Sequence, residues 1–348
     1  MKKLLAMVLA VAMVFSLVAC GGGSTTTSSD GETKHMTMVT DVGGVNDESF
    51  NMLAWRGHEK AGEELGLEVD YIESSQESDY APNMETAYDN GARLIWGIGF
   101  LMADAIVDAA TKNPDSMYAI IDNTFDEASM PSNLIGIAFR EQEPSFMVGY
   151  IAAKTSTSGK IGFVGGMENE VIIRFEAGYT AGAKFANPDI EVMINYVGNF
   201  NDSAQGKAIA QKQIQDGADV IFHAAGASGN GTIEACKDSG LPADGGVWAI
   251  GVDTDQNKLA PDNVLTSACK SVDEAILIIA REYADGSIEG GKNQVFGYAE
   301  NGVSIALTGD HIPADLQKEV ADLEAKVKDG SLVIPGTREE IDGFLSAQ

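Results

Sequence analysis

Short apolar runs alternate with amphipathic stretches along most of the chain, and this alternation constrains the fold more than any other feature. Residues 36–40 (MTMVT) and 68–72 (EVDYI) are short strand-like runs, and residues 49–65 between them have helical periodicity. Strands that alternate with helices predict βαβ units and a parallel sheet. The pattern predicts further strands at 94–97, 117–121, 160–165, 191–196, 220–222, 248–252, 264–268 and 303–307, and helices at 80–90, 143–154, 170–186, 203–216, 229–238, 272–284 and 314–328.

The alternation divides into two successive α/β units, which we expect to be two lobes. A turn-rich stretch at residues 155–159 separates them, so we place the boundary near Ser156. Elements remain after the second unit is complete, which indicates that the chain crosses back between the lobes. We therefore expect a first lobe of residues 36–155 plus about 270–300, and a second of 156–269 plus about 301–348.

The chain begins with the features of a secretory signal. Lys2 and Lys3 precede an apolar run over residues 4–15, and residues 17–20 read LVAC. A membrane-spanning helix is the alternative, but it requires roughly 20 apolar residues. We expect cleavage before Cys20, whose thiol would then accept lipid.

A polar segment follows, GGGSTTTSSDGETK at residues 21–34, and it has no apolar face to bury. Such composition is typical of a flexible tether. With residues 1–19 removed as the signal peptide, residues 20–35 would tether the folded part to the extracytoplasmic face of a bacterial cell membrane.

Composition excludes some partners. The 348 residues include 23 Lys and Arg against 52 Asp and Glu, a net charge of −29, which would repel nucleic acid phosphates. A hydrophobic content of 44% suits a folded core, and the length suits two domains. Cys236 and Cys269 lack metal-ligand spacing, so no metal site is expected; they could form a disulfide, but two unpaired buried thiols are the preferred interpretation.

Polar residues follow several predicted strands directly. Asp41, Asp122, His223 and Asp253 each stand where an apolar run ends. Ligands of open parallel α/β sheets bind at the carboxyl ends of the strands, so these side chains are candidates for a binding site. The alternative is that strand ends are simply rich in turn-forming residues.

Two glycine-containing loops carry further candidates. In residues 41–51, DVGGVNDESFN, Ser49 or Asp47 can cap the next helix, and Phe50 can offer a stacking face to a flat ligand, although a core position for Phe50 is the alternative. The loop GASGNG at residues 226–231 lacks the Lys-Ser/Thr ending of a nucleotide phosphate loop. It favours close approach to a neutral ligand.

No catalytic set is evident in the sequence. It contains neither a Gly-x-Ser-x-Gly elbow nor a His-Glu-x-x-His motif, and its 4 histidines are scattered. Carboxylates alone could act in acid–base catalysis, but they serve equally well as acceptors for a ligand's hydroxyl and amino groups. We therefore expect a binding protein without a cofactor rather than an enzyme.

The loop TDVGGVNDESFN at residues 40–51, together with the lipid-attachment cysteine, resembles the basic membrane protein (BMP) family of nucleoside-binding lipoproteins. The similarity covers nearly the whole chain after Cys20. Further matching segments are GGME at 165–168, RFEAGY at 174–179, GNFND at 198–202, AGASG at 225–229, GVDTDQ at 251–256, SACK at 267–270 and GSLVIPG at 330–336.

The resemblance implies a type I periplasmic-binding-protein fold, with two Rossmann-like lobes of parallel sheets joined by multiple crossovers. It implies a monomer that captures nucleosides, in particular purine nucleosides, and delivers them to an ABC-transporter permease. The family's site residues correspond to Phe50 and Phe200, which would sandwich the base; to Asp41, Asn46 and Asp122, which would bind its edge; and to Gly226, Asp253 and Lys270, which would hold the ribose hydroxyls. At Asn46 the family often has aspartate.

Three other functions compete with nucleoside capture. A sugar- or signal-binding lipoprotein of the same fold could use Asp253 and Lys270 in the same way. A surface antigen without a small-molecule site would leave the strand-end carboxylates without a role. An extracytoplasmic hydrolase would need a nucleophile and a base that the sequence does not offer.

Overall fold

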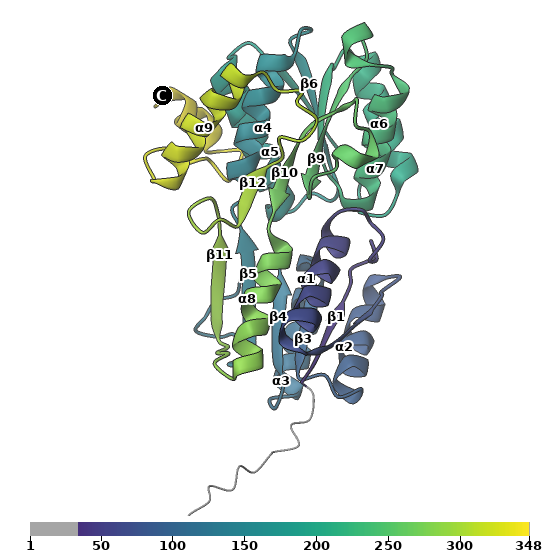
Figure 1. Ribbon diagram of the computed structural model, residues 1–348, viewed down its shortest axis with the longest axis vertical. Coiled ribbons are helices and arrows are strands. Elements are labelled where there is room, and N and C mark those ends of the chain that lie inside the picture. The colour runs from purple at the N-terminus through teal and green to yellow at the C-terminus, as the bar shows by residue number, and fades with distance from the viewer. Residues whose placement is uncertain (1–33, 348) are drawn as a thin grey trace, which may run out of the picture. The chain divides into compact units, whose positions relative to one another are not determined.

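Two six-stranded sheets organise the part of the chain that the computed structural model describes, residues 34–347 (Figure 1). The predicted signal peptide, Cys20 and almost all of the predicted tether lie outside these residues. Within residues 34–347, no helix combines the length and hydropathy needed to cross a membrane.

The first sheet has the strand order β2-β1-β3-β4-β5-β11, and all of its neighbouring strands are parallel. In such a sheet the order reverses between β1 and β3, and a crevice opens there at the carboxyl ends of the strands. Its strands are β1 (His35–Val39), β2 (Glu68–Ile72), β3 (Leu94–Ile98), β4 (Met117–Ile121), β5 (Leu134–Phe139) and β11 (Lys292–Phe296).

The second sheet repeats this plan in the order β7-β6-β8-β9-β10-β12, with the last strand antiparallel to β10. The reversal between β6 and β8 gives it a crevice of its own. Its strands are β6 (Lys160–Gly165), β7 (Glu191–Tyr196), β8 (Val220–Ala224), β9 (Trp248–Asp253), β10 (Val264–Lys270) and β12 (Val303–Ile305).

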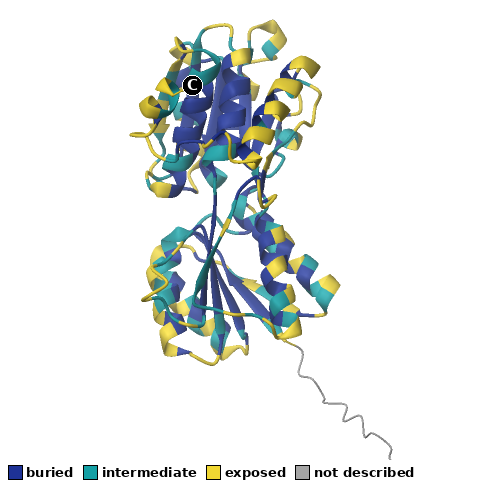
Figure 2. Ribbon diagram, turned by 90° about the vertical axis from the view of Figure 1, so that its left-hand side faces the viewer, coloured by how far each residue is buried: buried dark blue, intermediate teal, exposed yellow. Residues whose placement is uncertain are grey.

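Helices cover the sheets and leave the strands buried between them, as Figure 2 shows by the dark strands and the exposed outer helix faces. The first lobe contains α1 (Phe50–Leu65), α2 (Tyr80–Asp89), α3 (Ala103–Lys112) and α8 (Val272–Asp285). The second contains α4 (Gln142–Thr155), α5 (Glu170–Ala186), α6 (Ser203–Gln215), α7 (Gly226–Asp238), α9 (Ala314–Lys328) and α10 (Ile341–Ser346).

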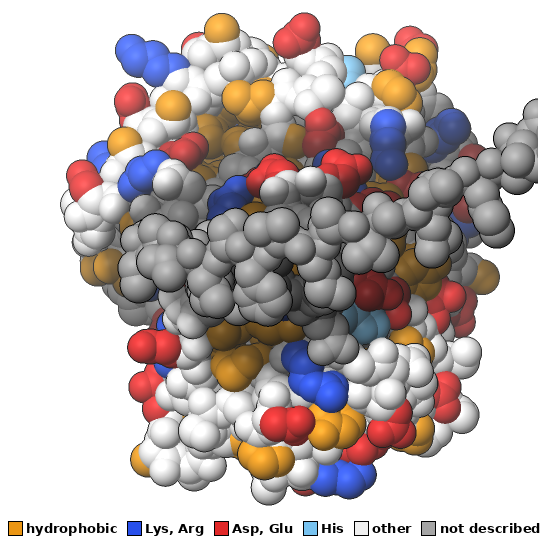
Figure 3. All heavy atoms as spheres, turned by 60° about the horizontal axis from the view of Figure 1, so that its bottom comes forward, with side chains coloured by type: hydrophobic (Ala, Val, Ile, Leu, Met, Phe, Trp, Pro, Cys, Tyr) orange, Lys and Arg blue, Asp and Glu red, His pale blue; other side chains and the backbone are white. Residues whose placement is uncertain are grey.

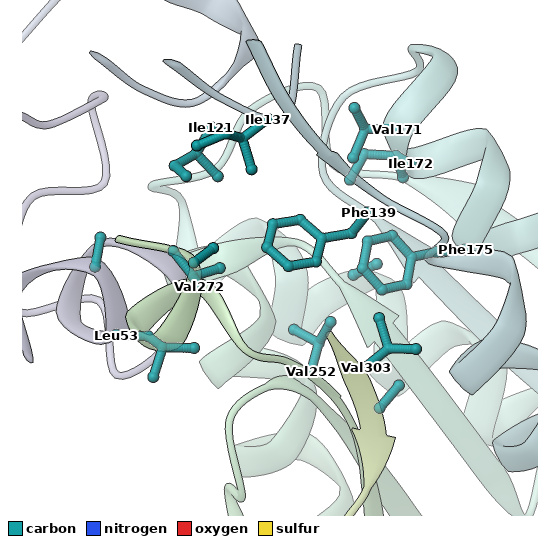
Figure 4. Packing of buried hydrophobic residues seen from close by; sticks show 14 of the residues in the cluster. Leu53, Ile121, Ile137, Phe139, Val171, Ile172, Phe175, Val252, Val272 and Val303 are labelled. Carbon is teal, nitrogen blue, oxygen red and sulfur yellow. The ribbon is translucent and has the colours of Figure 1, made fainter. Parts of the chain in front are cut away.

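The chain passes between the lobes three times, from β5 to α4, from β10 to α8 and from β11 to β12. The predicted α/β fold of two lobes joined by multiple crossovers is therefore confirmed. Buried side chains of both lobes also meet near these crossings. Figure 4 shows Phe139 and Phe175 side by side, with Val252 and Val303 next to them, and all four belong to one apolar core.

Helix α4 corrects our prediction that residues 143–154 belong to the first lobe. It packs on α5 with the two backbones almost in contact: a Cβ atom at Gly149 would lie 2.1 Å from the Tyr179 carbonyl oxygen, and one at Gly182 would lie 2.0 Å from that of Phe146. Only glycine permits such an approach. The first crossing therefore lies near Arg140, before α4, and not at Ser156.

Several elements escaped the sequence analysis. Strand β5 reads LIGIAF and is buried throughout, so it has no alternating pattern to mark it. Strand β11 is partly exposed and mostly polar, and it belongs to the first sheet only through its pairing with β5. Helices α3 and α10 were also not predicted.

Candidate ligand-binding site

A cavity lies between the lobes at the carboxyl ends of the strands, with about 560 Å³ of empty space, some of it open to solvent. Seven of the eight ligand-binding residues predicted from the sequence line it: Asp41, Phe50, Asp122, Phe200, Gly226, Asp253 and Lys270. The eighth, Asn46, is exposed and does not line the cavity.

The β1–α1 loop forms one end of the cavity, which we call the loop end, with Asp41, Asp47 and Asn51. The Asn51 amide donates to Asp41 Oδ1 (2.7 Å) and to Asp47 Oδ2 (3.0 Å), and the Gly43 N–H also donates to Asp41 Oδ1 (2.8 Å). Burial raises the pKa of Asp41 to about 7, despite these hydrogen bonds, and it also raises the pKa of Asp47. No cation contacts either carboxyl group among the described residues.

Asp47, rather than its neighbour Asn46, turns toward the cavity because it anchors the start of α1. Its carboxylate accepts hydrogen bonds from the backbone N–H groups of Ser49 (2.9 Å), Asn51 (2.8 Å) and Met52 (3.0 Å). The two capping candidates therefore have different roles: Asp47 satisfies the helix terminus, and Ser49 makes no side-chain capping bond.

The opposite end of the cavity, the crossover end, is an ion-pair chain of Asp122, Lys270, Glu141 and Arg174. Lys270 Nζ lies 2.7 Å from both carboxylate oxygens of Asp122 and 3.4 Å from Glu141 Oε1, and Arg174 Nε lies 2.6 Å from Glu141 Oε2. Burial disfavours the charged form of Lys270, but the surrounding carboxylates outweigh it and raise its pKa. The lysine is therefore an ammonium ion.

The structure pairs Lys270 with Asp122, which we had assigned to the base, rather than with Asp253. Asp253 Oδ2 instead accepts a hydrogen bond from Ser49 Oγ (2.6 Å), and burial raises its pKa to about 6. Asp122 and Asp253 both have a left-handed backbone, with φ of 68° and 63°. Aspartate tolerates this conformation better than most residues, and here it occurs where each strand ends at the cavity.

Aromatic rings from both lobes line the cavity. Phe50 begins α1 in the first lobe, and Phe200 follows β7 in the second, where its ring lies against Gly166; a Cβ atom there would be 2.2 Å from it. The Phe100 ring meets Phe200 edge-on at 6.0 Å, and Lys270 Nζ lies 5.0 Å from the centre of the Phe50 ring. The sequence left open whether Phe50 belongs to the core or to the site. Its side chain packs on the core and also lines the cavity.

Gly226 and His223 both lie near the cavity in the second lobe. Gly226 lines it at the start of α7 and has a φ of 53°, which glycine adopts freely. His223 does not line it: the ring is fully buried, Nε2 is 2.9 Å from Gln256 Oε1, and burial lowers its pKa to about 4. It is a neutral core histidine.

The β1–α1 loop also connects the lobes. Besides the bond from Ser49 to Asp253, the Gln256 amide donates to the Glu48 carbonyl (3.1 Å), and the Asn230 amide donates to the Asp47 carbonyl (3.0 Å). An exposed ion pair joins Lys258 Nζ to a Glu48 carboxylate oxygen at 2.6 Å. The lobes are thus closed on each other around the cavity.

Several residues of the cavity were not predicted: Asp47, Asn51, Phe100, Val171, Ile172 and Phe175. Figure 4 shows Val171, Ile172 and Phe175 along one helix, α5, near Phe139. Phe100 directly follows β3 and Gly99, so the rule that picked the strand-end carboxylates would have found it.

Among residues 34–347 no group of histidine, cysteine and acidic side chains could hold a metal ion. The two described cysteines, Cys236 and Cys269, are both free thiols, and they lie outside the cavity lining. On the face drawn in Figure 3, acidic and basic side chains are interspersed. The cavity between the lobes is the candidate site because it brings together seven of the predicted binding residues.

Comparison with known proteins decides the family. The model of the family described as "ABC transporter substrate-binding protein PnrA-like" (Bmp) matches residues 34–338. The chain belongs to this family. Bmp proteins are substrate-binding components of ABC transporters, so this chain is a binding protein and not an enzyme.

Individual relatives are similar to this chain over almost its full length. Basic membrane protein A2 of Borrelia garinii subsp. bavariensis is 40% identical over 346 residues, which cover 99% of both chains. The ABC transporter nucleoside-binding protein BmpA of Lactococcus lactis is 36% identical, covering 96% of this chain and 99% of its own. A solved solute-binding protein of an Aeropyrum pernix ABC transporter is 27% identical and superposes with a TM-score of 0.80 over 90% of this chain and 98% of its own.

Proposed function

We propose that this Bmp protein captures nucleosides, preferentially purine nucleosides, and delivers them to an ABC-transporter permease. The observation that carries the proposal is the pair Phe50 and Phe200, which line one cavity from opposite lobes. A flat heterocycle presents two π faces, and two rings from different lobes can cover both. The name of the Lactococcus lactis relative, a nucleoside-binding protein, supports the same ligand class.

The loop end suits the edge of a purine base. The two hydrogen bonds that described residues donate to the Asp41 side chain both reach Oδ1, so Oδ2 can accept one from a ligand N–H group. With its pKa raised to about 7 by burial, this carboxyl group is also accessible in its protonated form, which can donate a hydrogen bond. One carboxyl group could then serve 6-oxo purines as an acceptor and 6-amino purines as a donor.

The crossover end suits a ribose. The carboxylates of Asp122 and Asp253 can accept hydrogen bonds from vicinal hydroxyl groups, and the ammonium group of Lys270 can donate one to a hydroxyl or ring oxygen. Charge-assisted hydrogen bonds of this kind are strong in a closed cavity. We therefore move Asp122 from the base edge to the ribose, and Asp47 and Asn51 replace Asn46 near the base.

Calorimetric titration of residues 33–348, which form one compact unit, tests the ligand class. We expect heat with inosine, guanosine and adenosine, less with uridine and cytidine, and none with ribose alone. Phe200→Leu keeps the apolar bulk but removes the π face, and should weaken inosine binding about tenfold. Phe185→Leu is the matched control, because Phe185 packs against Phe146 and Phe344 away from the cavity. Heat with ribose but with no nucleoside would favour the sugar-binding alternative.

We further propose that the protein works as a monomer attached to the membrane by lipid at Cys20, on the extracytoplasmic face. In a bacterium that expresses the full chain, Cys20→Ala should release the protein from the membrane fraction and abolish labelling by radioactive palmitate. Retention of the label in this variant would refute the site of attachment.

A further inference from the structure

Glu141 is the most deeply buried charge near the cavity, yet it does not line the cavity wall. Its side chain is fully inaccessible to solvent, and it lies at the crossing from β5 to α4, just before the first residue of that helix. An ionised carboxylate in such a place is costly unless cations or hydrogen-bond donors compensate it. Its neighbours are therefore informative.

Both carboxylate oxygens of Glu141 face a cation, and the two cations come from different elements. Oε2 accepts from Arg174 Nε on α5 at 2.6 Å, and Oε1 lies 3.4 Å from Lys270 Nζ at the end of β10. Glu141 thus joins two of the three chain crossings, β5–α4 and β10–α8, and ties both to the second lobe's α5.

The position of the Lys270 ammonium group depends on the two carboxylates between which it lies. Its ammonium group lies 5.0, 5.1 and 5.7 Å from the ring centres of Phe50, Phe139 and Phe175, so the surroundings are mostly apolar. Only Asp122, which lines the cavity, and Glu141, which does not, contact it as ion pairs in the described chain. Without Glu141, the ammonium group would be drawn toward Asp122 alone.

We propose that Glu141 is a positioning residue for ligand binding: it holds the Lys270 ammonium group at the crossover end so that one N–H is directed to the ligand's hydroxyl groups, while Arg174 supplies the countercharge that Glu141 needs. This inference rests on the proposed nucleoside function for the identity of the ligand. It predicts that Glu141 affects only the part of the ligand that Lys270 contacts, although Glu141 never touches the ligand.

The test compares inosine with 2′,3′-dideoxyinosine, which has the same base but lacks both ribose ring hydroxyls. Glu141→Gln preserves the shape and removes the charge, and should lower the affinity for inosine about tenfold while changing that for dideoxyinosine less than about twofold. The control is Glu143→Gln, since Glu143 lies on the same turn, accepts from the Tyr298 N–H (2.6 Å) and does not contact Lys270. Unchanged inosine binding, or an equal loss for both ligands, would overturn the proposal.

If the wild-type chain binds no nucleoside, the proposed nucleoside function is wrong. The role of Glu141 can still be tested then, by a measurement that needs no ligand. The pKa of Lys270 is followed by NMR in lysine-labelled protein, with its signal assigned by its loss in Lys270→Met. In Glu141→Gln, the loss of the neighbouring carboxylate should lower the pKa of Lys270, and an unchanged pKa would overturn the proposal. If Glu141→Gln does not fold, Glu141→Asp, which withdraws the carboxylate by one methylene, should give the same selective loss of inosine affinity; an equal loss for both ligands contradicts us.

Discussion

The buried carboxyl groups at the two ends of the cavity have different partners. At the loop end, the partners of Asp41 and Asp47 within the described part of the chain are all hydrogen-bond donors without charge, and burial raises the pKa of both. At the crossover end, Asp122 and Glu141 share the cation Lys270, and Arg174 completes the chain of alternating charges.

One closed cavity therefore combines an end whose buried carboxyl groups have no cation beside them in the described chain with an end where a buried ammonium group lies between carboxylates. The loop end is adaptable because a carboxyl group near its pKa can donate or accept a hydrogen bond. The crossover end is selective because its ammonium group always donates. Four measurements test whether the two ends differ in this way.

The largest effect should follow Lys270→Met, which removes the one cation that contacts Asp122 among residues 34–347. Inosine affinity should fall at least about 100-fold, and the free energy of unfolding should fall by roughly 3–5 kcal/mol, because two carboxylates lose their buried partner. Calorimetry and urea unfolding measure the two quantities. A stability as high as that of the wild type would show that the crossover end does not depend on its buried ion pairs.

The pH dependence of stability tests the loop end. Asp41 has an ordinary pKa of 3.8 when unfolded and about 7 when folded, so between these values only the folded protein binds the proton. Its contribution is therefore complete below about pH 4 and is lost as the pH rises to about 7. Relative to Asp41→Asn, the free energy of unfolding of the wild type should fall by up to about 4 kcal/mol over this window. Asp253 is present in both proteins, so its contribution cancels when the variant's free energy of unfolding is subtracted from that of the wild type. Parallel pH curves for the two proteins would contradict the prediction.

Ser49→Ala should have an intermediate effect, because it removes a buried hydrogen bond between the lobes. Asp253 would lose the hydroxyl that lies 2.6 Å away, and the closed form would be less favourable. We expect inosine affinity to fall about five- to tenfold in calorimetry, with a slower approach to the bound state. Undiminished affinity would mean that the ligand alone holds Asp253 in place.

Lys258→Ala should have the smallest effect, although it also breaks a contact between the lobes. The ion pair of Lys258 with Glu48 is exposed, with 58% and 41% of the two side chains accessible, so solvent screens it. Inosine affinity should change less than about twofold, and even less at 0.5 M salt than at low salt. A loss as large as that in Ser49→Ala would show that burial does not distinguish the interlobe contacts.

Much of the fold and of the cavity could be predicted because strand ends are readable in a parallel sheet. Asp41, Asp122 and Asp253 each follow an apolar run, and all three line the cavity. The same rule, applied to β3, leads to Phe100. Glu141 was missed for a related reason: it follows β5, a strand that we did not predict, so its place at a strand end was hidden.

The rule about strand ends could not predict which residue of the β1–α1 loop faces the cavity. Asn46 and Asp47 are neighbours in a segment without periodicity, and which of them turns inward depends on which caps the helix. The pairing of Lys270 with Asp122 was also out of reach, since Asp122 is 148 positions away in the sequence and follows a strand of the other sheet.

The glycine contacts between α4 and α5 have a mechanical consequence. Where two backbones touch at Gly149 and Gly182, no side chain can slide or change rotamer to absorb a displacement. The helix pair should therefore behave as a single rigid lever. Any hinge motion that opens the cavity must then bend the chain at the three narrow crossings, and the first of these is the place where Glu141 sits.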